Sequence, residues 1–140
     1  MTRLRDEETD SPDGCEEASH YVLGGAHVGT TIAEQLQAAG HRVAIVDGSY
    51  GSDDVPRFAG DPATIDVLVD AGVATASTVI VATRSDRRNL LIAQLVRSRF
   101  DVPEIIAFVN DPDRVPLFAD AGHEPFCVTT AVTEKFGETI

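Results

Sequence analysis

YVLGGAHVGTTIA, residues 21–33, is the stretch of the sequence that decides the fold. An apolar run leads into a glycine-rich turn, and the turn opens directly onto a helix-like sequence. This order predicts a strand followed by a helix whose N-terminal N–H groups are open to an anion such as a pyrophosphate. The spacing follows G-x-G-x-x-G with alanine in the second position, at Gly24, Ala26 and Gly29. The alternative is a plain strand-to-helix connection of an α/β fold.

A carboxylate follows at the distance that a dinucleotide site requires. A second apolar run, residues 43–46, ends in Asp47, which lies 18 residues after Gly29. A carboxylate roughly 20 residues beyond the glycines binds a ribose 2′-hydroxyl in such sites. A 2′-phosphate at ~4 Å would meet a like charge at a cost of about 4 kcal/mol, so Asp47 favours NAD or an adenine nucleotide over NADP. The alternative is that Asp47 only caps a turn or a helix.

The composition is that of one acidic domain. The chain has 140 residues, of which 43% are hydrophobic, and this is enough for a single core. The formal charge of −12, with 23 acidic against 11 basic residues, argues against nucleic acid or an anionic membrane as a partner. Lys135 is the only lysine. High acidity with almost no lysine resembles proteins of salt-loving organisms, although an acidic surface is also common in bacterial proteins.

The sequence also predicts the cellular compartment. Cys15 and Cys127 show no metal-like spacing, which favours free thiols in a reducing cytoplasm. No stretch approaches the roughly 18 apolar residues of a membrane-spanning helix. Residues 1–19 lack the apolar centre of a signal peptide. We therefore expect a cytoplasmic protein without direct membrane insertion.

The chain divides into an arm and a domain. Residues 1–18 are charged and polar, and they predict a disordered acidic arm because they offer little to bury. Residues 19–140 alternate between strand-like and helix-like segments. Strands are expected at 20–23, 42–46, 57–59, 78–82, 104–109 and 126–128, and helices at 28–39, 61–71, 86–99, 111–121 and 131–140. This alternation predicts an α/β fold: a Rossmann-like, doubly wound, mainly parallel six-stranded sheet with helices on both faces.

Two of these helices carry more detailed predictions. The helix at 28–39 has apolar residues at i, i+4, i+8 and i+11, which predicts a single buried stripe of Val28, Ile32, Leu36 and Ala39. In the helix at 61–71, Asp61 is the expected N-cap and Pro62 the expected first residue. A role for Asp61 as a cap alone is an alternative to a role in binding.

Motifs spread over most of the chain resemble one family. They are Val22–Gly29, Ile45–Asp47, Gly60-Asp61, Asp70–Gly72, Val79–Thr83, Asp86, Asn89–Leu91, Ile105–Ala107, Val109–Pro112 and Ala121-Gly122. Together they are specific, whereas each of them alone is not. From about residue 20 onward the chain resembles the TrkA-N family, the nucleotide-binding N-terminal domains of regulators of potassium conductance (RCK or KTN domains).

The resemblance implies a set of ligand-binding residues. The glycine turn would hold a pyrophosphate, the acid after the second strand the adenosine ribose, the Gly-Asp after the third strand the adenine, and the Thr-x-x-Asp loop the rest of the ligand. The implied residues are Gly24, Gly25, Ala26, His27, Val28, Gly29, Asp47, Gly48, Gly60, Asp61, Thr83, Arg84 and Asp86. No catalytic residue and no metal ligand are implied.

Three residues depart from the family pattern, and one cluster stays ambiguous. Ala26 adds a methyl group where the fingerprint has bare backbone. His27 stands where an arginine is common, so phosphate binding there would weaken as the pH rises through the histidine pKa. Phe108 stands where many relatives carry a basic residue.

The basic cluster of Arg84, Arg87 and Arg88 fits a phosphate or partner contact, and it fits solvated helix-start arginines equally well. His20, His41 and His123 lack metal-ligand spacing and are expected at the surface or at strand ends.

The expected function is regulatory. The resemblance implies a domain that senses NAD(H), or alternatively ATP or ADP, and controls a potassium uptake system or channel, with a homodimer or higher homo-oligomer as the assembly. Apolar faces around Leu91, Leu95 and the helix of Phe118 are the expected oligomer contacts. A membrane transporter or channel subunit is the expected partner, which would place the domain at the inner face of the membrane. The alternatives are an NAD-dependent oxidoreductase domain and a dimerisation scaffold without a ligand. The sequence leaves open the nucleotide, the transporter, the oligomeric state and whether the chain is part of a longer protein.

Overall fold

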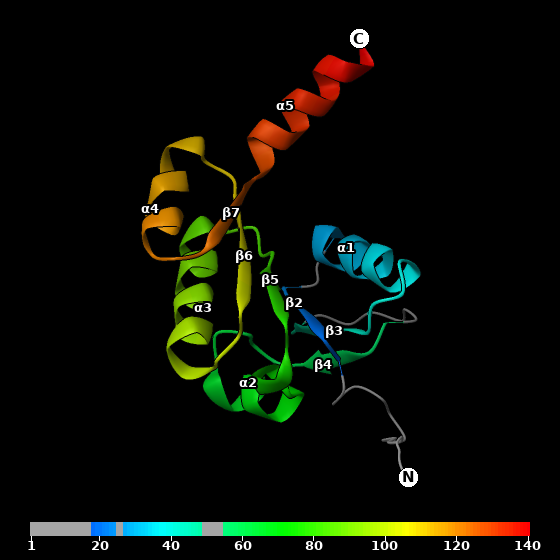
Figure 1. Cartoon of the computed structure of the whole chain (residues 1–140), viewed down its shortest axis with the longest axis vertical. Coiled ribbons are helices and arrows are strands. Elements are labelled where there is room, and N and C mark those ends of the chain that lie inside the picture. The colour runs from blue at the N-terminus through cyan, green and yellow to red at the C-terminus, as the bar shows by residue number, and fades with distance from the viewer. Residues whose placement is uncertain (1–17, 25–26, 49–54) are drawn as a thin grey trace.

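A six-stranded parallel sheet forms the centre of the molecule (Figure 1). The computed structural model describes residues 18–24, 27–48 and 55–140. The strands are β2 (His20–Leu23), β3 (Val43–Asp47), β4 (Arg57–Ala59), β5 (Thr78–Val81), β6 (Glu104–Val109) and β7 (Glu124–Cys127). Their order across the sheet is β4-β3-β2-β5-β6-β7, and every neighbouring pair is parallel. The predicted Rossmann-like fold is therefore confirmed, with a sheet that is parallel throughout.

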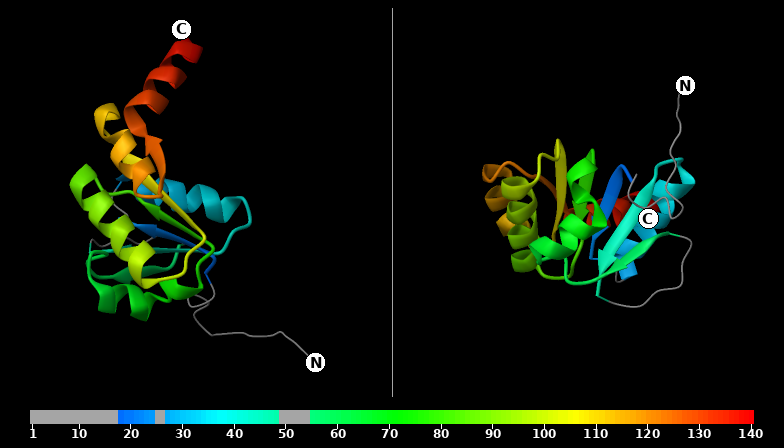
Figure 2. Two further views of the ribbon diagram at one scale, coloured as in Figure 1. Left: turned by 60° about the vertical axis from the view of Figure 1, so that its left-hand side comes forward. Right: turned by 90° about the horizontal axis from the view of Figure 1, so that it is seen from below.

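Helices cover both faces of this sheet (Figure 2). They are α1 (His27–Ala38), α2 (Ile65–Ala71), α3 (Asp86–Arg99), α4 (Val115–Asp120) and α5 (Val128–Thr139), with the short 3₁₀ helices η2 (Val73–Thr75) and η3 (Pro112–Arg114). Side chains of α2, α3 and α4 pack on one face and those of α1 on the other. Strands covered on both faces need continuous apolar runs, and β2 and β5 have them.

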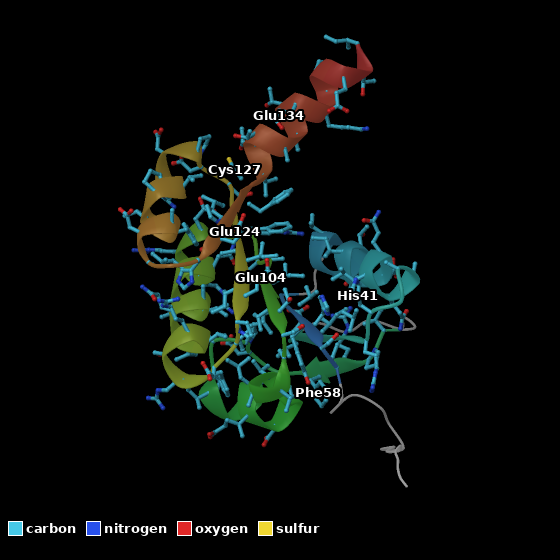
Figure 3. The ribbon with its side chains drawn as sticks, in the orientation of Figure 1. His41, Phe58, Glu104, Glu124, Cys127 and Glu134 are labelled. Atoms are coloured by element: carbon cyan, nitrogen blue, oxygen red, sulfur yellow. The ribbon has the colours of Figure 1, made fainter. Side chains whose placement is uncertain are left out.

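The larger part of the core lies under α2, α3 and α4. Leu68, Ile92 and Phe118 from these helices are almost completely buried against the sheet. Phe58 of β4 packs against the same cluster (Figure 3). The phenol of Tyr21 is fully buried and donates a hydrogen bond to the carbonyl of Ala71 at 2.7 Å. Phe118 itself therefore faces the core, and the expected oligomer contact through the helix of Phe118 stays a prediction.

Helix α2 begins later than predicted. Its first residue is Ile65 and its N-cap position is Thr64, so Asp61 is not the cap. The Asp61 carboxylate instead accepts a hydrogen bond from the backbone N–H of Ala63 at 2.9 Å. This local turn places Thr64 in an extended conformation, with φ −110° and ψ 124°, and the helix can start only after it.

The predicted stripe of α1 is only partly buried. Of the predicted stripe, Ile32 and Leu36 are half-buried beside Ala33, whose side chain is fully buried. Val28 is 54% exposed because it lies in the first turn, at the rim of a small cavity, and Ala39 is exposed beyond the helix end.

The predicted helix at 111–121 is divided into η3 and α4. Pro116 lies in the first turn of α4 and has no N–H group. It therefore cannot donate the helical hydrogen bond to the carbonyl four residues earlier, at Pro112. A 3₁₀ turn over Pro112–Arg114 precedes a separate short α-helix for this reason.

Helix α5 extends away from the sheet (Figure 1). It starts three residues earlier than predicted, and none of its residues is buried. Leu91 of α3 and Leu117 of α4 are both 56% exposed, so apolar surface is present on these two helices. Among the described helices, none combines the length and the apolar character needed to cross a membrane.

Candidate functional site

The glycine turn allows an unusually close approach between β2, β5 and α1. Gly24 has a φ of +98°, and a Cβ atom there would lie 2.7 Å from the Thr83 methyl group and 3.0 Å from the Thr83 nitrogen. A Cβ atom on Gly29 would overlap the carbonyl of Gly24. Gly24 is therefore required by backbone geometry and by space, and Gly29 by space. Gly25 and Ala26 lie outside the described residues, as does the side chain of His27, the first residue of α1.

A cavity of about 400 Å³ lies at the C-terminal ends of β2, β3 and β5. Its described lining consists of Gly24, Asp47, Pro62, Ala82, Thr83, Arg84, Ser85 and Arg88. From β2 the chain adds β3 and then β4 on one side of the sheet. It then returns to the other side of β2 and adds β5, β6 and β7 in the opposite direction. The cavity thus lies where the strand order reverses, which is where open parallel sheets bind ligands. Of the predicted site residues, the structure brings together Gly24, Asp47, Thr83 and Arg84.

Asp47 is paired with an arginine that the sequence analysis missed. Its side chain is 18% exposed, and its Oδ2 atom lies 3.5 Å from Nη1 of Arg57. The other guanidinium nitrogen, Nη2, donates to the hydroxyl of Thr30 in α1 at 2.9 Å. Arg57 is the register partner of Ile45, two residues before Asp47, so both charged side chains lie on the same face of the sheet.

A second ion pair lies beside the cavity. Arg88 of α3 donates to Asp61 Oδ1 at 2.8 Å, and both side chains are about half exposed. The N–H of Ala63 and the Arg88 guanidinium lower the pKa of Asp61. Gly60 precedes this turn, and a Cβ atom there would lie 2.8 Å from a methyl group of Val67. Gly48 follows β3 as an exposed residue with open space around its Cα.

Thr83 is held by a completely buried amide. The Thr83 N–H and hydroxyl donate to Oδ1 of Asn89 at 3.0 and 2.5 Å. The Asn89 Nδ2 group donates to the carbonyls of Thr83 at 3.1 Å and Phe108 at 2.9 Å. All hydrogen-bonding groups of this amide are therefore used within the protein, and its role is to fix the loop after β5.

Asp86 is equally engaged. Its side chain is 5% exposed, and it accepts hydrogen bonds from the backbone N–H groups of Asn110 at 2.7 Å and Asp111 at 3.0 Å. The side-chain amide of Asn110 adds a third bond at 3.0 Å. Burial alone would raise the pKa of Asp86, but the hydrogen bonds outweigh it and lower the pKa. Asp86 is not among the described lining residues of the cavity, and it ties the loop after β5 to the loop after β6.

A smaller cavity of about 90 Å³ adjoins the first. Its described lining is Val28, Ala82, Thr83, Arg84, Phe108, Asn110 and Val128. Arg84 lines both cavities, whereas Arg87 lines neither within the described chain. Two members of the basic cluster, Arg84 and Arg88, therefore point to the site, and Arg87 is solvated.

The other histidines lie elsewhere. The rings of His20 and His41 contact each other at a centroid distance of 4.3 Å, and His20 begins β2, at the end of the strand opposite the cavity. Burial and the neighbouring His41 lower the pKa of His20. His123 directly precedes β7 but is only 4% exposed, so it is a buried residue rather than a surface one. Burial, with a smaller effect of Arg97, lowers the pKa of His123.

Comparisons with known proteins identify relatives of this fold and site. The TrkA-N domain family matches residues 21–129. A Trk system potassium uptake protein TrkA homolog of Methanothermobacter thermautotrophicus is 32% identical over 108 residues, which are 72% of this chain and 50% of the relative. The chain thus spans about half the length of this curated relative.

Two solved structures share the fold. The NAD(P)-binding domain of an exopolyphosphatase-related protein from Archaeoglobus fulgidus is 26% identical, with a TM-score of 0.78 over 87% of this chain and 96% of that chain. The GsuK channel bound to NAD is 26% identical, with a TM-score of 0.66 over 77% of this chain and 21% of that chain. None of these comparisons supports the predicted salt-loving origin.

Proposed function

The chain belongs to the TrkA-N domain family, and we propose that it is a regulatory nucleotide-binding domain of a potassium uptake system or channel. The observation that carries this proposal is the cavity at the reversal of strand order, where Gly24 and Asp47 meet Arg84 and Arg88. Backbone N–H groups, a carboxylate and two cationic side chains are the groups that bind phosphate and ribose.

The site divides by chemistry into two parts. We assign the ribose to Asp47, at the end of β3, and the phosphates to the glycine turn with Arg84 and Arg88. In a chain with a formal charge of −12, two arginines at one cavity provide a local attraction for an anion. NAD(H) is the proposed ligand, and ATP and ADP are the alternatives. The GsuK channel is described as bound to NAD in one structure and to ADP in another, so the solved structures support both of these candidates.

Binding rather than turnover fits the described lining. The Ser85 hydroxyl accepts a hydrogen bond from the Arg88 N–H and so caps α3, and the Thr83 hydroxyl bonds to Asn89. Neither a histidine nor a lysine is among the described lining residues, so no nucleophile and base are paired there. A nucleotide can regulate a partner only by binding one shape of the domain more tightly than another. The proposed assembly is a homodimer or higher homo-oligomer next to a membrane transporter or channel subunit.

Calorimetric titration of the whole chain with NADH, NAD, ADP and ATP tests this function. We expect one of them to bind, with no loss of NADH when carbonyl compounds are added. Asp47→Asn should weaken binding about tenfold, because a charged hydrogen bond to the ribose is replaced by a neutral one. Asp70→Asn, on an exposed position of α2, is the matched control and should bind as the parent does.

Two results would contradict the proposal. A folded protein that binds none of the four nucleotides would be a scaffold. Consumption of NADH with a carbonyl substrate would make the domain an oxidoreductase.

A further inference from the structure

We propose that Arg57 determines which substituent the site accepts at the 2′ position of a bound adenosine. This inference rests on the proposed function, because it requires that Asp47 faces the ribose. Arg57 belongs neither to the glycine fingerprint nor to the carboxylate after β3. It contacts Asp47 from β4 and is not itself among the described lining residues of the cavity.

Arg57 is held in place by two different elements. Nη1 lies 3.5 Å from Asp47 Oδ2, at the end of β3, and Nη2 donates to Thr30 Oγ1 in α1 at 2.9 Å. The Arg57 side chain is only 10% exposed. A guanidinium held from two sides and shielded from water has one orientation, and it restrains the rotation of the carboxylate it contacts.

The first consequence concerns a 2′-hydroxyl. A hydroxyl donates to a carboxylate oxygen only when that oxygen lies along the O–H direction. Because Arg57 contacts Oδ2, it sets which way the Asp47 carboxylate turns toward the cavity. Arg57 therefore acts as a positioning residue for the contact between Asp47 and the ribose.

The second consequence concerns a 2′-phosphate. A lone carboxylate would repel this dianion, and the sequence alone predicts strong exclusion of NADP. The permanently charged guanidinium next to Asp47 makes this corner of the site close to neutral. The wild-type protein should therefore discriminate against a 2′-phosphate less strongly than Asp47 alone would.

Three ligands that differ only at the 2′ position test the inference. They are 5′-AMP, 2′-deoxy-5′-AMP and adenosine 2′,5′-bisphosphate, titrated into the whole chain and its variants. In Arg57→Gln we expect the affinity for 5′-AMP to fall about tenfold. The affinity for the deoxy compound should fall by less than about threefold. The affinity for the bisphosphate should fall at least about thirtyfold, because the Asp47 carboxylate is left without its counter-charge.

A second variant covers the case in which Arg57→Gln fails to fold. Arg57→Lys keeps the charge without the planar fork, so it should retain binding of the bisphosphate and lose part of the preference for 5′-AMP over the deoxy compound. Arg99→Gln, at the exposed end of α3, is the control for removal of an arginine.

A purely structural arginine would change the affinities of all three ligands by one common factor, and this result would overturn the inference. Equal affinities of the wild-type protein for 5′-AMP and its deoxy form would also overturn it. So would a wild-type protein that binds none of the three. In that last case the titration with NADH decides separately whether the proposed function stands.

Discussion

Two aspartates that follow the C-terminal ends of parallel strands have opposite environments. The Asp86 side chain is 5% exposed and accepts three hydrogen bonds from the loop at residues 110–111. The Asp61 side chain is 54% exposed and pairs with Arg88 beside the cavity. Both follow a strand, and both were predicted to bind the ligand from the sequence.

We call Asp86 and Asn89 the closed cluster, and Asp47, Asp61 and Arg88 the open cluster. The closed cluster has its hydrogen bonds satisfied within the protein, while Asp47 and Arg88 of the open cluster line the cavity. The difference teaches that a carboxylate or amide at a strand end holds the loops of the site in place when all its hydrogen bonds are made to protein groups. Under the proposed function, such a group contacts the ligand only where the cavity reaches it, as at Asp47, whereas Asp61 and Asp86 are not among the described lining residues.

The largest effect is expected at Gly24, which lines the cavity together with Asp47 and lies against Thr83, the residue that Asn89 holds. Gly24→Ala places a methyl group 2.7 Å from the Thr83 side chain at a φ of +98°, and we expect it to lower the free energy of unfolding by about 3 kcal/mol. Gly40 has the same φ of +98°, but a Cβ atom there would have no atom of a non-neighbouring residue within 4 Å, so Gly40→Ala should cost only about 1 kcal/mol. Urea unfolding measures both. Equal losses would show that the close approach to Thr83 has no energetic consequence.

The closed cluster should be the next most sensitive. Asn89→Ala leaves the N–H of Thr83 and the carbonyl of Phe108 buried without their present partner, and we expect a loss of about 2–3 kcal/mol. The melting temperature should fall by roughly 10 °C. Gln94→Ala, at an exposed position of the same helix, is the control and should melt like the parent. A melting temperature within a degree or two of the parent would show that the buried amide is dispensable.

Asp86→Asn should have a smaller effect that depends on pH. At pH 7 we expect a loss of about 1–2 kcal/mol, because three donors lose an ionised acceptor. The folded-state pKa of Asp86 is lowered, so this stabilisation is complete above the unfolded value of about 3.9 and disappears as the pH falls through the folded pKa. Denaturation of both proteins at pH 7 and near pH 3 measures the difference. A difference that stays constant over this range would contradict the assignment.

The open cluster should contribute least to stability. Asp61→Asn weakens an exposed ion pair with Arg88, so the free energy of unfolding should change by less than about 0.5 kcal/mol. Thermal melting in low and in high salt measures the effect, which salt should reduce further. A loss as large as that of Asn89→Ala would place Asp61 in the closed cluster instead.

Much of the fold could be predicted because its signals are local. The helix at residues 86–99 and the strands at 20–23, 57–59 and 104–109 have the predicted bounds. Apolar β-branched runs mark the buried strands, and Ser85 caps α3 through the N–H of Arg88. The glycine turn was predictable for the same reason, since Gly24 and Gly29 occupy the two positions where the close approach leaves no space for a side chain.

The remaining features depend on contacts between distant segments. Arg57 reaches Asp47 only through the parallel register of β4 on β3, which no local pattern contains. The burial of Asp86 depends on the loop at residues 110–111, 24 residues further along the chain. The start of α2 depends on which hydrogen bond the Asp61 carboxylate makes, and a cap and a turn use the same residue type.

The most direct test of the account compares Asp47→Asn with Asp86→Asn in one experiment. Each folded variant is titrated with the nucleotide that the parent binds most tightly, and its melting temperature is recorded. We predict that Asp47→Asn weakens binding about tenfold, while Asp86→Asn lowers the melting temperature and leaves the dissociation constant within about threefold of the parent. A folded Asp86→Asn protein that loses as much affinity as Asp47→Asn would contradict the division into a closed and an open cluster.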